Sequence, residues 1–138
     1  MRKLITILAV VGAIGCGGDS TGPSNDYPNV AGIYELAGTF DDLPADQITG
    51  TLTLVQPDRT SGNFGGSIVA SVSSADVTIN SGLPSISTVS KSGLVNFVVS
   101  NGTASWVFNG TLTGNVISGR HTLSDATSSF SGSWTATR

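Results

Sequence analysis

The sequence predicts an all-β protein: a small antiparallel up-and-down β-barrel of about eight strands, with a β-sandwich as the alternative architecture. Three observations support this. From Val30 onward, apolar and polar residues alternate in short runs rich in Val, Ile and Thr, which is the pattern of half-buried strands. Gly, Asn, Ser and Pro separate these runs at short intervals, as turn residues do. No stretch places apolar residues at helical spacing over three turns.

The alternation also gives the strand boundaries. In order along the chain, the predicted strands cover residues 32–40, 48–55, 63–72, 76–80, 94–100, 103–113, 116–123 and 128–137. A break at 81–84 separates the fourth strand from a short edge piece at 85–89. Asn101-Gly102 is a strong signal for a type I′ hairpin, and Gly114-Asn115 is the next tight turn. Consecutive hairpins of this kind favour a meander, and closing it into a barrel removes exposed strand edges.

Six aromatic side chains are predicted to point into this barrel. They are Phe64, Phe97, Trp106, Phe108, Phe130 and Trp134. A barrel of eight strands is either filled by its own side chains or holds one small ligand. Packing of the six rings against one another is one expectation. Lining of a ligand cavity is the other, because several inward positions carry small residues: Gly50, Gly66, Ala70, Gly110 and Gly132.

The N-terminus has the layout of an export signal. Arg2 and Lys3 precede an apolar run from Leu4 to Ile14, and basic residues before a short apolar core are typical of secretory signals. This run is too short to cross a hydrocarbon layer of roughly 30 Å. We therefore expect a cleaved leader and not a membrane-spanning helix.

The end of the run, Ala13-Ile14-Gly15-Cys16, resembles the lipobox of bacterial lipoproteins. The resemblance covers residues 1–16 and departs at Ala13, where the family prefers Leu. It implies cleavage before Cys16 and acylation of this cysteine, which is the only one in the chain and has no disulfide partner within it. Two or more acyl chains give stable membrane anchoring. Gly17, where inner-membrane lipoproteins of enterobacteria carry Asp, favours the outer membrane or the cell surface.

Three segments follow from these features. Residues 1–15 form the leader, residues 16–29 the lipidated cysteine and a flexible tether without apolar periodicity, and residues 30–138 a single β-barrel domain.

Within the barrel domain, two segments resemble the first and last strands of calycins, the lipocalin and avidin-like barrels. They are Gly32-Ile33-Tyr34-Glu35-Leu36 and Gly132-Ser133-Trp134. The lipocalin motif has Trp where this chain has Tyr34.

The charge distribution excludes a nucleic-acid-binding protein, and the residue types present do not favour a hydrolase. Without the leader, nine acidic residues face four scattered basic ones, Arg59, Lys91, Arg120 and Arg138, so no basic stripe for nucleic acid is present. His121, with Asp125 and nearby serines, permits a Ser–His–Asp interpretation. A structural or partly exposed histidine is favoured, because no nucleophile elbow accompanies it.

No metal site or cofactor is predicted. The acidic run 41–46 lacks the spacing of a calcium loop and is interpreted as a solvated turn. Because neither a catalytic triad nor a metal site is favoured, we expect that the protein is not an enzyme. The sequence leaves two functions open: an anchored barrel that binds a small apolar ligand, or a solid barrel that contacts an unidentified envelope protein.

Overall fold

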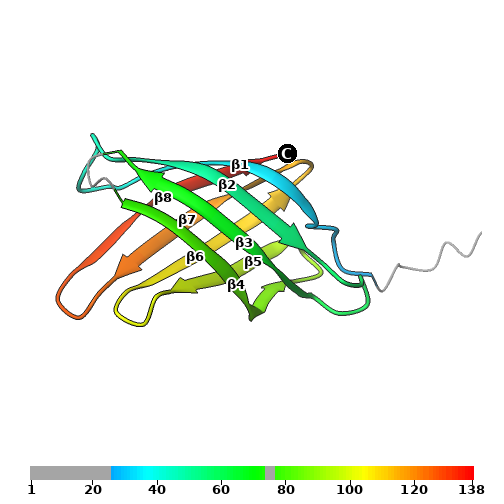
Figure 1. Cartoon of the computed structure of the whole chain (residues 1–138). Coiled ribbons are helices and arrows are strands. Elements are labelled where there is room, and N and C mark those ends of the chain that lie inside the picture. The colour runs from blue at the N-terminus through cyan, green and yellow to red at the C-terminus, as the bar shows by residue number, and fades with distance from the viewer. Residues whose placement is uncertain (1–25, 74–76) are drawn as a thin grey trace, which may run out of the picture.

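The protein forms a closed antiparallel barrel of eight strands in a computed structural model that describes residues 26–73 and 77–138 (Figure 1). Each strand pairs with the next in sequence, and the first and last strands close the ring. The strands are β1 (Gly32–Thr39), β2 (Gln47–Val55), β3 (Asn63–Val72), β4 (Val77–Val89), β5 (Leu94–Ser100), β6 (Ser105–Thr113), β7 (Val116–Ser124) and β8 (Ser129–Thr137). The predicted meander barrel is thus confirmed, and the sandwich alternative is not adopted.

The predicted leader and Cys16 lie outside the described residues. So does most of the predicted tether, up to residue 25. Within the described chain, no helix is long and apolar enough to span a bilayer.

The predicted break at 81–84 is wrong, because β4 runs through it to Val89. Gly66 of β3 pairs with Leu83, whereas Phe64 pairs with Ser87, so residues 84–86 of β4 lie opposite Gly65 alone. This irregularity contains Pro84, and a bulge is where a strand tolerates a residue without a backbone N–H. The sequence signal for a break was therefore a signal for a bulge, and the edge piece at 85–89 is the second half of β4.

The turn between β5 and β6 also differs from the prediction. Ser100 pairs with Ser105, so the loop has four residues and not two. The side chain of Asn101 explains this, since its Oδ1 accepts the backbone N–H groups of Thr103 and Ala104 at 3.0 and 2.8 Å. The predicted Gly114-Asn115 turn is confirmed: Thr113 pairs with Val116, and Gly114 adopts a φ of 60°.

The barrel interior follows the predicted alternation and is packed with aromatic rings. The rings of Phe97 and Phe108 stack with centroids 4.7 Å apart, and the indole of Trp134 meets Phe108 edge-on at 5.2 Å. Trp106 lies 4.8 Å from Phe108. These rings form one continuous cluster, so most of the barrel is filled by its own side chains.

The inward glycines do not leave a cavity, contrary to the expectation from their size. A Cβ on Gly110 would lie 2.9 Å from Cζ2 of Trp134, so the indole occupies the space. A Cβ on Gly132 would lie 1.7 Å from the carbonyl oxygen of Thr39, so here neighbouring backbone comes close. Glycine at these positions permits the tight coiling of a small barrel.

The two ends of the barrel differ. One end, here called the closed end, carries the chain entry at residue 26, the β2–β3 loop and the C-terminus (Figure 1). Val30 covers this end and is fully buried. Its backbone N–H donates to Oε1 of Gln56 at 3.1 Å, and its carbonyl accepts the Tyr34 hydroxyl at 2.8 Å. Arg138 adds a hydrogen bond to the Ala31 carbonyl at 2.7 Å. The opposite end, here called the cleft end, carries the β1–β2, β5–β6 and β7–β8 connections.

Candidate functional site: a cleft between β4 and β5

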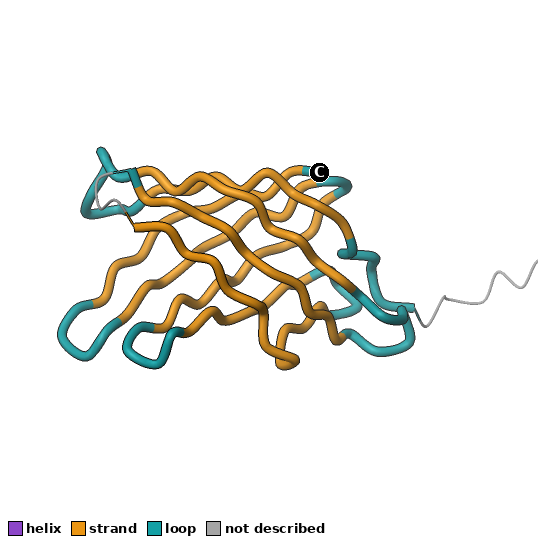
Figure 2. The backbone as a smooth tube through the Cα atoms, viewed as in Figure 1, coloured by secondary structure: helices purple, strands orange, loops and turns teal. Residues whose placement is uncertain are grey.

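The barrel wall opens between β4 and β5. In the described register these strands pair at two positions, Thr88 with Asn96 and Val89 with Val95, whereas β3–β4 and β5–β6 are paired along most of their length. On the N-terminal side of Thr88, β4 and β5 diverge toward the cleft end (Figure 2). A cleft of about 440 Å³ lies there. The bulge lies between the part of β4 that pairs with β5, Thr88 and Val89, and the part that lines the cleft, residues 78–81.

The cleft has an apolar floor and a polar rim. Trp106 of β6 and Leu123 of β7, which are cross-strand partners, form the floor with Val99 and Ile79. The rim consists of exposed polar residues on β4, β5 and the β5–β6 loop: Thr78, Asn80, Ser100 and Asn101. Ser81 and Ala104 complete the lining. Small-molecule sites commonly have this composition, an apolar interior with a few polar groups that orient the ligand.

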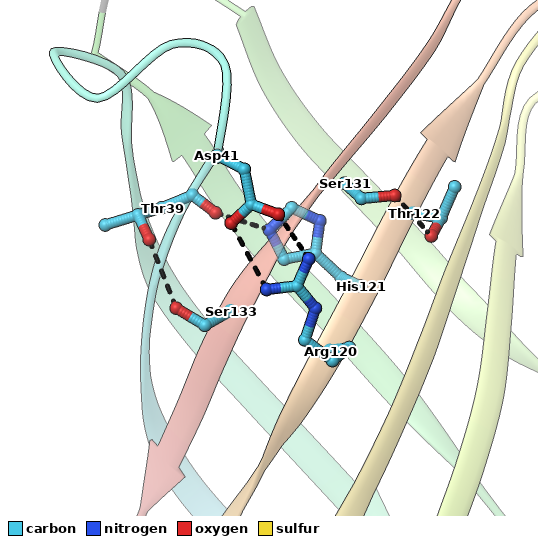
Figure 3. Close-up of polar contacts among 7 residues, drawn as sticks. All are labelled: Thr39, Asp41, Arg120, His121, Thr122, Ser131 and Ser133. Atoms are coloured by element: carbon cyan, nitrogen blue, oxygen red, sulfur yellow. Dashed lines mark hydrogen bonds and ion pairs between the residues drawn. The ribbon is translucent and has the colours of Figure 1, made fainter.

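Trp106 is held in place by a histidine inside the barrel. Its Nε1–H donates to Nδ1 of His121 at 3.0 Å, and Nε2 of His121 lies 2.9 Å from the carbonyl oxygen of Thr39. An indole N–H can only donate, so Nδ1 must be unprotonated. The proton is therefore on Nε2, which donates to Thr39 (Figure 3). The hydrogen bonds fix one neutral tautomer of the ring.

The surroundings of His121 favour that neutral form. The residue is fully buried, and the ring of Phe40 meets it edge-on at 4.9 Å. Burial is the largest influence and lowers the pKa of His121 below its usual value of 6.5. The Thr39 hydrogen bond and the charge of Asp41 act in the opposite direction, while Arg120 adds to the lowering. A buried, uncharged ring is expected at neutral pH.

The Ser–His–Asp interpretation finds no support in this geometry. Both nitrogens of His121 are engaged by Trp106 and Thr39. Asp125 lies in the β7–β8 loop, where its Oδ1 accepts the backbone N–H groups of Thr127 and Ser128 at 2.8 and 2.7 Å. Its carboxylate thus stabilises its own turn.

The acidic run after β1 is tied to the barrel surface. Asp41 forms a two-pronged ion pair with Arg120 of β7 next to His121 (Figure 3), and hydrogen bonding from Arg120 lowers the pKa of Asp41. Among residues 26–73 and 77–138, no three His, Cys, Asp or Glu side chains gather in a way that could hold a metal ion.

The six aromatic residues that the sequence predicts to point inward lie in different parts of the barrel. Trp106 lines the cleft. Phe97, Phe108 and Trp134 pack against one another in the interior. Phe64 meets Phe97 edge-on at 6.4 Å, and Phe130 lies partly buried against the same core.

Sequence reasoning missed the contribution of β4 to the cleft. Thr78, Ile79, Asn80 and Ser81 form one wall of it. The signal that could have found this wall is Gly82 and Pro84, which were interpreted as a break between strands. A proline inside a predicted strand also indicates a place where strand pairing is interrupted.

Comparison with known proteins supports the fold. No protein-family model and no curated protein sequence matches this chain. Among solved structures, the chain is similar to a designed protein described as "De novo design of a fluorescence-activating beta barrel". The TM-score is 0.55 at 12% sequence identity, over 78% of this chain and 93% of the designed one. At this identity the similarity shows a common barrel fold.

Proposed function

We propose that this protein is an envelope lipoprotein whose barrel binds a small apolar molecule in the cleft between β4 and β5. The observation that carries the proposal is the cleft itself, with Trp106 and Leu123 at its floor and exposed polar side chains at its rim. Its volume of about 440 Å³ lies within the usual range of ligand pockets, about 300–1,000 Å³. The similar designed barrel is described as fluorescence-activating, which is consistent with a small-molecule role for such a fold.

The described chain enters the barrel at the end opposite the proposed site. The described chain begins at Asp26 near the closed end, and the cleft lies at the other end (Figure 1). A lipid on Cys16 would therefore attach upstream of the closed end. We propose that the cleft faces away from the membrane, on the outer membrane or cell surface of the bacterium, where a ligand can enter without passing the lipid.

Filling the cleft tests the binding proposal. Ala104 lines the cleft, and its side chain takes no part in the hydrogen bonds of the β5–β6 loop. We expect Ala104→Trp to weaken binding of the apolar dye N-phenyl-1-naphthylamine at least about tenfold, equivalent to roughly 1.4 kcal/mol. Fluorescence titration of residues 26–138 measures this.

The matched control is Ala126→Trp, which adds the same side chain to the exposed β7–β8 loop at the same end. It should bind the dye like the unsubstituted protein. Equal affinities for all three proteins would exclude the cleft as the binding site. Circular dichroism must first show that each variant retains the strand content of the parent.

The anchor has its own test. After expression in a bacterium that processes lipoproteins, we expect the whole-protein mass to correspond to a chain that starts at Cys16 and carries acyl groups. An unmodified Cys16, or a chain that retains residues 1–15, would refute the lipoprotein proposal. Cys16→Ala should abolish the acyl mass.

A solid barrel that contacts an envelope protein is the second candidate. The packed rings of Phe97, Phe108 and Trp134 favour it, because they leave the barrel centre filled. An enzymatic role is not proposed, since both nitrogens of His121 are engaged in the interior. Hydrolytic activity that disappears in His121→Ala would overturn that view.

A further inference from the structure

We propose that His121 is a positioning residue for the cleft: its neutral ring holds the indole of Trp106 in the floor, and protonation of the ring releases the indole and weakens ligand binding. This inference rests on the proposed function, because it concerns the regulation of the same cleft. His121 itself does not line the cleft; it acts through Trp106, which does.

The donors and acceptors around the ring allow one arrangement. Nδ1 accepts from Trp106 at 3.0 Å, and Nε2 donates to Thr39 at 2.9 Å. A second proton would go to Nδ1 and place two N–H donors opposite each other. The bond to Trp106 must then break, because an indole nitrogen has no accepting lone pair. Protonation of His121 therefore necessarily breaks the hydrogen bond from the indole of Trp106.

Packing prevents the ring from avoiding this conflict by turning. Phe40 covers it edge-on at 4.9 Å, and Phe108 lies 5.8 Å away. On the β8 side, a Cβ at Gly132 would lie 2.7 Å from Nε2. The absence of a side chain at Gly132 thus makes room for the contact with Thr39. Closely packed interiors switch between discrete arrangements and do not deform gradually.

The charges near His121 do not cancel the effect of burial on its pKa. Asp41 of the β1–β2 loop and Arg120 of β7 act on the ring, the first raising and the second lowering the pKa of His121. They are paired with each other and about half exposed, so solvent screens both. On the β6 and β8 sides the ring meets Trp106, Phe108 and Gly132, which carry no charge. Burial therefore dominates and lowers the pKa.

The sign of the pH effect follows from the lowered pKa. The unfolded chain takes up a proton at His121 below about pH 6.5, whereas the folded ring resists it. The stability contributed by the neutral ring is complete above pH 6.5. It falls as the pH drops from 6.5 through the lower pKa of the folded protein. Release of Trp106, and weaker ligand binding, are expected in this acidic range.

Nuclear magnetic resonance of the ligand-free full-length protein tests the switch. At pH 7.5, ¹H–¹⁵N spectra should show His121 as the Nε2–H tautomer. On acidification, the indole N–H signal of Trp106 should move with the titration of His121. Trp134 is an internal control, because its indole N–H donates to the backbone carbonyls of Asn109 and Arg120 at 3.1 Å each. The inference would be overturned by an Nδ1–H tautomer, or by a Trp106 indole N–H signal whose chemical shift does not change as His121 titrates.

Two substitutions separate positioning from general structural damage. Gln at position 121 offers one acceptor and one donor but does not titrate. His121→Gln should bind N-phenyl-1-naphthylamine within about twofold of wild type at pH 7.5 and keep that affinity at pH 5. Wild type should lose affinity as the pH falls through the titration of His121, which the spectra of the same protein locate. His121→Leu offers neither group and should bind weakly at both pH values.

The dye experiment distinguishes the two proposals. Wild-type binding that is tight but independent of pH would refute the role of His121 and leave the proposed function standing. No dye binding at any pH would refute the proposed function, and with it the coupling between His121 and the cleft.

Discussion

Replacing Trp134 with Ala is expected to destabilise the barrel by about 3–5 kcal/mol, the usual cost of removing a large buried aromatic side chain. Trp134 is 1% exposed and meets Phe97 at 5.7 Å and Phe108 at 5.2 Å. Its indole also occupies the space that Gly110 leaves open. A cavity at this point would interrupt the central ring cluster. Urea unfolding followed by circular dichroism measures the loss.

The control for this substitution is Thr135→Ala, one residue along β8 and on the outer face, where the side chain is exposed. Surface changes of this kind usually alter stability by about 0.5 kcal/mol or less. A Trp134→Ala protein as stable as this control would mean that the interior does not depend on the ring cluster described above.

Gly132→Ala should have an effect of similar size for the opposite reason, overpacking. A Cβ there would lie 1.7 Å from the Thr39 carbonyl oxygen and 2.7 Å from Nε2 of His121. The Thr39 oxygen is backbone and cannot turn away, so β1 and β8 must separate locally. We expect a loss of about 3 kcal/mol or more, at the upper end of what overpacking costs. Thermal and urea unfolding both report this.

Gly65→Ala is the matched control, because a Cβ at Gly65 has no atom of the described side chains or backbone within 4 Å. Its stability should stay within about 0.5 kcal/mol of the parent. If both glycine variants behaved alike, the close approach of β1 and β8 at Gly132 would be wrong. Gly132→Ala should also disturb the titration of His121, which ties this prediction to the switch at Trp106.

The sequence was sufficient to predict the barrel, because the alternation of apolar and polar residues is a local pattern. Alternation placed Tyr34, Leu36 and Phe40 on one face, and all three are buried. Likewise, Val95, Phe97 and Val99 face inward as predicted. Period-two alternation reports burial directly, since one face of each strand meets the core. Gly110 was predicted to face inward, and the space beside it is taken by the indole of Trp134.

The cleft and its histidine depend on contacts that are remote in sequence. His121 meets Trp106 fifteen residues away and Thr39 eighty-two residues away. Nothing local in the sequence indicated that the ring would be fully buried, or which groups would face each nitrogen. The β4 residues that line the cleft lie on the N-terminal side of a register shift against β3, and alternation alone does not determine the pairing register. For this reason the sequence named Trp106 correctly as inward without locating the cleft beside it.

Native mass spectrometry of residues 26–138, exported by a bacterium and purified without detergent, is the sharpest test of ligand binding in the cleft. We predict a fraction of molecules with an added mass that leaves on denaturation, and the loss of this fraction in Ala104→Trp but not in Ala126→Trp. A bare protein mass in every preparation, with no small apolar molecule retained by any variant, would contradict a binding role. It would direct attention to the solid barrel and a protein partner.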